Sequence, residues 1–175
     1  MDDPRLSRSG RLRGSGRRLA LAAALALAAG LTAPAALAAC AKPPQPELPR
    51  SALVIETAAG PQRFSVELAE TEEQKSCGLM LRQRLGRDEG MLFHYQPPSE
   101  AWMWMANTVI PLDMIFIAPN GRIVHLVEDA TPFSHETVGT PLPVSGVLEL
   151  RAGTVARLGI RAGDRVRHAI FGATP

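Results

Sequence analysis

Short apolar segments separated by proline- and glycine-rich turns constrain the fold of this chain most. Phe64, Val66 and Leu68 alternate with more polar neighbours, a period of two that is typical of a strand with one buried face. Pro119-Asn120-Gly121 lies between two apolar runs and predicts a hairpin turn. The segments with strand character cover residues 53–57, 63–69, 90–95, 102–108, 112–118, 122–127, 144–150 and 164–171.

Two short helices are expected between these strands. Thr71 and Gln74 form a capping box, so a helix should begin there and run to about Leu81. A second helix should cover residues 152–158 and end at Gly159. The fold class predicted from these elements is α+β and mostly β: a compact barrel-like or sandwich domain of eight or nine short strands with two short helices. Pro97-Pro98 is expected to end a strand, and residues 128–143 are expected to form a loop.

The N-terminal region has the pattern of an export signal. A basic stretch ending at Arg18 precedes residues 19–39, which carry no charge and are mostly Ala and Leu. Leu37-Ala38-Ala39-Cys40 fits a lipobox, in which Cys40 carries a lipid and becomes the first mature residue. We therefore expect a signal peptide over 1–39, a proline-rich tether over 40–50 and one globular domain over 51–175. The expected location is the periplasm or cell envelope, with the lipid anchor as the contact to the membrane; Arg17-Arg18 leaves the general and twin-arginine export routes both open.

The positive charge of the chain belongs to the leader. The whole chain has 19 Lys+Arg and 17 Asp+Glu, and residues 1–39 contain six arginines and two aspartates, which leaves 13 basic and 15 acidic residues in the remainder. No basic surface of the kind that binds nucleic acid is expected there.

The two cysteines, Cys40 and Cys77, allow two interpretations. If both stay as thiols until export, a disulfide is plausible in an oxidising compartment. If Cys40 carries lipid, Cys77 is a lone thiol, and a buried lone cysteine is usually a small apolar side chain.

The segment 102–113 is the strongest candidate for a binding site. It holds both tryptophans, Trp102 and Trp104, followed by Asn107, Thr108 and, after Pro111, Asp113. Apolar bulk beside a few polar groups is typical of a small-ligand pocket. The structural alternative, which we favour, is that one tryptophan lies in the core and the other covers an edge. Asn107 and Thr108 would then shape the turn toward Pro111.

Two carboxylates lie within apolar runs, where an unpaired charge is costly to bury. Asp113 is expected to accept hydrogen bonds that hold a loop, with Asn107 or Thr108 as its nearest partner. Glu149 lies in Val-Leu-Glu-Leu and poses the same problem. Together, Asp113 and Glu149 are weak candidates for the acid and base of a hydrolase, if they converge.

A copper site is a further alternative. Met103, Met105 and His94 supply soft and imidazole ligands of the kind that Cu(I) prefers, although methionine is also a common core residue.

The order of the motifs resembles the domain-of-unknown-function family 192. They are Gly78-Leu79-Met80, Gly90-Met91-Leu92-Phe93, Trp102 to Asp113, Leu112 to Ile117, Val147 to Leu150, Ala152-Gly153, Leu158-Gly159-Ile160 and Gly163-Asp164. The resemblance runs from about Phe64 to Val166 and implies a compact β-rich domain, often exported and lipid-anchored, with no agreed reaction. This chain departs from the pattern at Ala106, where the family often has Lys, and Cys77 is not part of the pattern.

The expectation that follows is an exported, lipid-anchored, non-catalytic module that binds a small ligand or an envelope protein and needs no cofactor. An enzyme that hydrolyses envelope polymers through Asp113 and Glu149, and a copper-handling protein, are the alternatives.

Overall fold

A computed structural model describes residues 40, 42–173 and 175 and confirms the mostly β, α+β fold class. Seven strands form one sheet in the order β5-β4-β6-β3-β2-β1-β7. All neighbouring strands are antiparallel except β2 and β3, which are parallel. The strands are β1 (Arg50–Thr57), β2 (Gly60–Ala69), β3 (Glu89–Met103), β4 (Leu112–Ile117), β5 (Ile123–Ala130), β6 (Val138–Arg151) and β7 (Arg165–Arg167).

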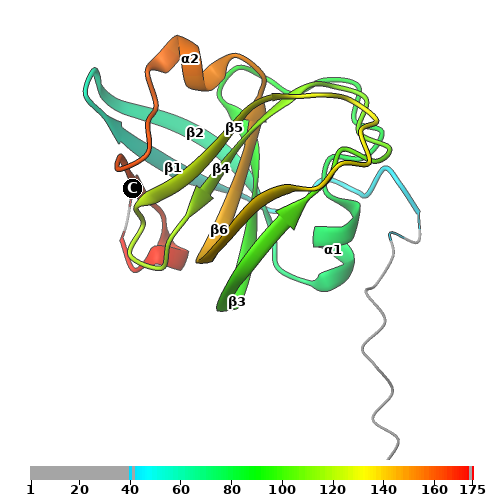
Figure 1. Cartoon of the computed structure of the whole chain (residues 1–175), viewed down its shortest axis with the longest axis horizontal. Coiled ribbons are helices and arrows are strands. Elements are labelled where there is room, and N and C mark those ends of the chain that lie inside the picture. The colour runs from blue at the N-terminus through cyan, green and yellow to red at the C-terminus, as the bar shows by residue number, and fades with distance from the viewer. Residues whose placement is uncertain (1–39, 41, 174) are drawn as a thin grey trace, which may run out of the picture. The chain divides into compact units, whose positions relative to one another are not determined.

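The sheet curls into a half-barrel, and its two outer strands meet at one end (Figure 1). Arg122, just before β5, forms an isolated bridge with Arg165 of β7. The Val166 backbone N–H donates to the Gly121 carbonyl at 2.8 Å, and the Ile123 N–H donates to the Asp164 carbonyl at 3.0 Å. This closure pairs backbone groups that two open sheet edges would leave exposed.

Strands β3 and β6 form a long antiparallel pair that bends in the middle (Figure 1). Their register is regular up to His94 opposite Gly146, then shifts before Ser99 opposite Val144. The predicted strand end at Pro97-Pro98 is therefore wrong: the prolines lie at the bend, and β3 continues to Met103. Two predicted strands are thus one, which explains why the sheet has seven strands rather than eight or nine. We call residues 99–103 of β3 and 138–144 of β6 the distal arm.

The bend gives the central strands an apolar core on each face. One core lies inside the curl and includes Leu92, Ile115 and Leu148. The other lies on the opposite face and includes Met91, Met114 and Val147 from the same strands, together with Ala101 and Val144 of the distal arm. All six residues of β4 are buried as a result.

Both predicted helices are present and short. Helix α1 (Glu72–Cys77) begins at the Thr71–Gln74 capping box, as predicted, but ends at Gly78 rather than near Leu81. Helix α2 (Thr154–Leu158) ends at Gly159, as predicted. The predicted loop over 128–143 is shorter, because β5 extends to Ala130 and β6 begins at Val138. The last predicted strand is only β7, and a 3-10 helix η1 (Ala169–Phe171) follows it.

The proline-rich segment before β1 packs on the domain instead of standing off it as the predicted tether. Gln45 is buried, and its amide donates to the carbonyls of Gln74 and Gly78 at 3.0 and 2.9 Å. Cys40 forms a disulfide with Cys77 at the end of α1. The Gln45 amide thus gives a partner to the carbonyl of Gly78, the residue that caps α1, and a second partner to the carbonyl of Gln74.

The predicted signal peptide, 1–39, lies outside the described residues. Within the part that is described, no helix has both the length and the apolar character needed to cross a membrane.

Candidate functional site

The structure divides the predicted site residues between two places. Trp102, Trp104 and Thr108 line one cleft, which we call the tryptophan cleft. Asn107 lies beside it in a turn, with a φ of 58° and its amide 3.9 Å from the Met80 sulfur. Asp113 lines a different hollow. The Asn107 carbonyl accepts from the Leu81 N–H at 2.8 Å, which joins this turn to the segment after α1.

The tryptophan cleft has a volume of about 320 Å³ and lies between α1, the first half of β3 and the distal arm. Three groups of side chains line it: the exposed face of α1, aromatic residues of β3, and methionines from the flanking segments. The lining residues are Glu72, Lys75, Ser76, Cys77, Met80, Phe93, Tyr95, Glu100, Ala101, Trp102, Met103, Trp104, Thr108 and Glu149.

Both tryptophans lie at the surface, so the interpretation that one belongs to the core is wrong. Trp102 is 51 % exposed and Trp104 is 46 % exposed. Side chains alternate between the two faces only within a strand, and β3 ends at Met103, so this rule does not fix the direction of Trp104. The indole N–H of Trp102 donates to Glu100 at 3.2 Å. Two half-exposed indoles beside a cleft offer flat apolar area and a polar edge, which suits ligand contact.

Glu149 at the floor of the cleft is the most unusual group in the site. It lies on β6 between Met91 of β3 and Met114 of β4, both fully buried. A methionine side chain has no hydrogen-bond donor, so neither neighbour can donate to the Glu149 carboxyl group. Its own exposure is only 4 %. Within the described residues, nothing hydrogen-bonds to or forms an ion pair with its carboxylate, and the residue lines the tryptophan cleft.

The other buried carboxylates are fully partnered. Glu67 accepts from the Leu48 N–H at 2.8 Å and pairs with Arg82 at 3.1 Å and Arg50 at 3.5 Å. Asp113 accepts three backbone N–H groups. Because a buried charge without partners costs several kcal/mol, the fold supplies partners to both. Glu149 differs from them by having none.

The protonation of the cleft follows from this burial. Desolvation raises the pKa of Glu149 from its ordinary 4.5 to about 8, so at neutral pH the side chain is mostly an uncharged acid. Burial, with smaller effects of Glu149 and Glu72, raises the pKa of Tyr95 to about 12. The Tyr95 hydroxyl lies 3.5 Å from the Met103 sulfur. A strongly shifted carboxyl group in a cleft is a common mark of a functional site.

Asp113 has the structural role that we favoured, but with other partners than predicted. Its carboxylate accepts from Asp129 at 3.0 Å, Gly153 at 3.2 Å and Val155 at 2.8 Å, not from Asn107 or Thr108. These bonds tie the end of β5 and the start of α2 to β4. The hollow beside Asp113 is larger, about 730 Å³, but the carboxylate there is already committed to the backbone.

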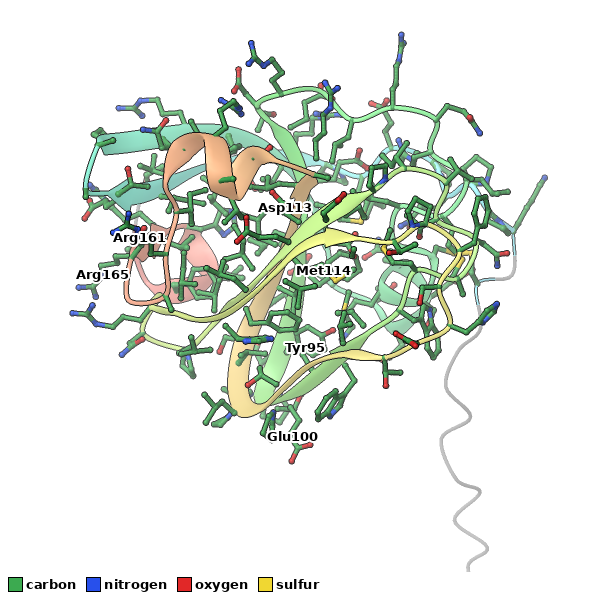
Figure 2. All side chains as sticks on the ribbon, turned by 45° about the horizontal axis from the view of Figure 1, so that its top comes forward. Tyr95, Glu100, Asp113, Met114, Arg161 and Arg165 are labelled. Carbon is green, nitrogen blue, oxygen red and sulfur yellow. A yellow bond between two sulfur atoms is a disulfide. The ribbon has the colours of Figure 1, made fainter. Side chains whose placement is uncertain are left out.

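Asp113 and Glu149 do not converge. Asp113 pairs with Leu150, which faces the core inside the curl, whereas Glu149 pairs with Met114 and faces the other core. Successive residues of a strand point to opposite faces, so the two carboxylates lie on opposite sides of the sheet. Figure 2 shows Asp113 near α2, away from Tyr95 and Glu100 at the cleft. The predicted hydrolase pair is therefore not assembled.

The candidate copper ligands are not brought together either. Met105 is buried in the outer core, and Met103 contacts Tyr95. His94 lies 3.7 Å from Glu70. Burial, with a smaller effect of nearby His94, lowers the pKa of His168. Because His94 lies between Phe93 and Tyr95, which line the cleft, it faces the other side of β3. Among residues 40, 42–173 and 175, no group of three His, Cys, Asp or Glu side chains could hold a metal ion.

Sequence reasoning missed the part of the cleft contributed by α1 and by Tyr95. Lys75 is 2.6 Å from Glu72 and 4.9 Å from the centre of the Tyr95 ring. The sequence does hold a signal for Tyr95, because residues two apart in a strand share a face and Tyr95 therefore lies on the same face as Phe93. The position of α1 against that face depends on Cys40, Gln45 and Gly78, and no local pattern encodes it.

We expect Asp113→Leu to lower the free energy of unfolding by about 3 kcal/mol or more, because each buried N–H without an acceptor costs about 1–3 kcal/mol. Asp113→Asn should cost less, since its Oδ1 can still accept from Asp129 and Gly153. Urea unfolding measures both. Asp164→Asn is the control, because its partly exposed carboxylate accepts one backbone N–H, that of Arg161 at 2.8 Å. An Asp113→Leu variant as stable as this control would contradict the role.

The raised pKa of Glu149 gives a pH-dependent stability. Between pH 4.5 and about 8 the folded chain keeps a proton that the unfolded chain releases, so Glu149 lowers stability as the pH rises through this range. The loss is at most about 1.4 kcal/mol per pH unit. We expect Glu149→Gln to match the wild type near pH 4.5 and to be more stable at pH 8.5. A difference in unfolding free energy that stays constant with pH would show that the carboxyl titrates normally.

Comparisons with known proteins agree with the fold and leave the function open. No curated protein matches the chain. A structure from Novosphingobium aromaticivorans DSM 12444, described as a protein of unknown function, is 38 % identical with a TM-score of 0.69 and covers 71 % of this chain and 89 % of its own. A structure from Sinorhizobium meliloti 1021, provisionally described as a transcription regulator, is 41 % identical with a TM-score of 0.69 and covers 72 % and 98 %. The model of an uncharacterised family, described as Uncharacterized ACR, matches residues 54–168, and the chain belongs to this family, domain-of-unknown-function family 192.

Proposed function

We propose that the chain is a non-catalytic binding module that holds a small ligand in the tryptophan cleft. The observation that carries the proposal is Glu149, a buried carboxyl group that lines the cleft and has no partner among the described residues. A free buried polar group at the floor of a hollow is stabilised when a ligand supplies the missing hydrogen bond. The half-exposed Trp102 and Trp104 supply apolar contact at its rim.

The arrangement does not favour catalysis. A hydrolase of the predicted type needs two carboxyl groups across one scissile bond, about 5–10 Å apart and facing the same space. Here Asp113 faces the other side of the sheet and is held by three backbone N–H groups. The excess of acidic over basic residues after position 39 also gives no support to nucleic-acid binding, despite the description of the Sinorhizobium relative.

The binding proposal is tested by native mass spectrometry of the domain purified without denaturation from an exporting bacterial host. We expect a retained small molecule that is lost in Trp102→Ala and in Glu149→Gln, with melting temperatures near that of the wild type for the exposed Trp102. Leu142→Ala is the matched control, since Leu142 is 50 % exposed but does not line the cleft. A ligand retained equally by all variants, or a protein partner bound through another surface, would contradict the proposal.

We further propose that the chain is exported to the cell envelope, on the basis of the leader described above. Lipid attachment at Cys40, expected from the sequence, competes with the disulfide, because the sulfur that it needs is the one that joins Cys77 in the structure. A sulfur atom cannot form both bonds, so the disulfide-linked and lipid-anchored forms exclude each other. An oxidising envelope favours the disulfide once the leader has been removed by a peptidase that recognises Ala36-Leu37-Ala38.

For the mature chain in an exporting host, we expect an intact mass without diacylglycerol that rises on reduction and allows two cysteines to be alkylated only then. Cys77→Ser removes the partner of Cys40 and should leave one freely alkylated thiol. Mature wild-type protein that carries lipid on Cys40 would establish the lipoprotein form and exclude the disulfide.

A further inference from the structure

We propose that the ligand of the tryptophan cleft is a small organic cation, a quaternary or protonated amine with an apolar body, whose charge is met by Glu149. This inference rests on the proposed binding function and names its ligand class. It follows from three properties of the cleft: its excess of carboxyl groups over cationic side chains, its aromatic surfaces and the absence of a donor at Glu149 within the described part of the chain.

The charges that line the cleft favour a positive ligand. Lys75 is the one cationic side chain among the lining residues, and its amine is already 2.6 Å from Glu72. Two carboxyl groups then remain, Glu100 and Glu149, and Glu100 accepts only the neutral indole N–H of Trp102. An anionic ligand would have to approach both carboxyl groups without a free cation to receive it.

The aromatic residues offer the surfaces that organic cations bind. Tyr95 and Phe93 line the inner part of the cleft, and Trp102 and Trp104 line its rim. The negative face of an aromatic ring attracts a cation by about 0.5–2 kcal/mol, and tryptophan is the best of these rings. The chain already uses this interaction, because the Lys75 amine lies 4.9 Å from the Tyr95 ring centre.

Glu149 completes the site because it has no cation of its own. Glu67, the comparable buried glutamate, has Arg50 and Arg82 within 3.5 Å. At Glu149 the side chains facing the same space that carry charge or titrate are Glu72 and Lys75 of α1 and Tyr95 and Glu100 of β3, while its β4 neighbour Met114 has neither property. A cation that enters the cleft therefore supplies the charge that Arg50 and Arg82 supply to Glu67.

An uncharged ligand such as a sugar is the main alternative, since indoles also stack on sugars and a protonated Glu149 can donate a hydrogen bond. The two classes differ in their linkage to protons. A cation favours the ionised form of Glu149, so its binding releases a proton and strengthens as the pH rises toward the pKa of the free group. An uncharged ligand has no such requirement.

The probe is choline, and its control is 3,3-dimethylbutan-1-ol, which has the same shape without the charge. Choline keeps its charge at every pH, so any pH dependence belongs to the protein. Titration calorimetry at pH 6.5, 7.5 and 8.5 on the full mature chain measures both, and the indole N–H signals of Trp102 and Trp104 in NMR spectra report where they bind. We expect choline to bind more tightly than the alcohol at pH 8.5 and to weaken by up to about tenfold per pH unit below 8.

Variants locate the effect. Glu149→Gln should remove both the preference for choline and its pH dependence, whereas Trp102→Ala should weaken choline without changing the pH dependence. Glu73→Gln removes an exposed carboxylate of α1 that does not line the cleft and should change neither. A preference for choline that survives Glu149→Gln, or that Glu73→Gln removes as well, would overturn the role of Glu149.

The remaining outcomes separate the ligand class from the binding function. Equal binding of choline and the alcohol with shifted indole signals would overturn the cation class but keep the cleft as a binding site. No binding of either probe would also overturn the cation class, and the retained ligand found by native mass spectrometry would then decide the binding function by itself.

Discussion

Burial of both faces of the central strands is the constraint on which the rest of the structure depends. The bend of β3 and β6 places the distal arm over the outer face of the sheet, so β4 has no exposed residue and β6 has none from Val144 to Leu150. In strands buried on one face only, a carboxylate can turn to water. Here each carboxylate in β4 or β6 must find a donor, lose its charge, or lie beside a hollow. Asp113 takes the first solution, and Glu149 takes the second and third.

The two solutions lie on opposite faces of the sheet. Asp113 faces the core inside the curl, where the N–H groups of Asp129, Gly153 and Val155 converge on it and fix α2. Glu149 faces the outer core, where its methionine neighbours cannot donate a hydrogen bond and where it lines the tryptophan cleft. Asp113 and Glu149 look equivalent in sequence, since each is an acid within an apolar strand. Their surroundings differ because Asp113 pairs with Leu150, the residue next to Glu149, and adjacent residues of a strand face opposite sides of the sheet.

The parts of the fold with local signals could be predicted from the sequence. The capping box at Thr71 and the hairpin at Gly121 were correct because they depend on neighbouring residues. The continuity of β3 through Pro97 could not be predicted, since a proline normally ends a strand and here the long-range pairing with β6 resumes after a register shift. Long-range contacts also explain why the sequence predicts only part of the tryptophan cleft. Trp102 and Thr108 were identified within one segment, but the wall formed by α1 comes from a segment about twenty-five residues earlier.

The covalent state of Cys40 bears on the cleft as well as on localisation. Cys77 is the last residue of α1 and lines the cleft, and its bond to Cys40 draws residues 42–49 against α1. The Gln45 amide then donates to the carbonyls of Gln74 and Gly78 at α1, and the Leu48 N–H donates to Glu67 of β2, so the segment is bound to both elements. Without the disulfide these hydrogen bonds must hold the segment alone, and a constraint that restricts the unfolded chain is lost. The position of Lys75 and Glu72 at the cleft therefore depends on the same sulfur atom that a lipid anchor would use.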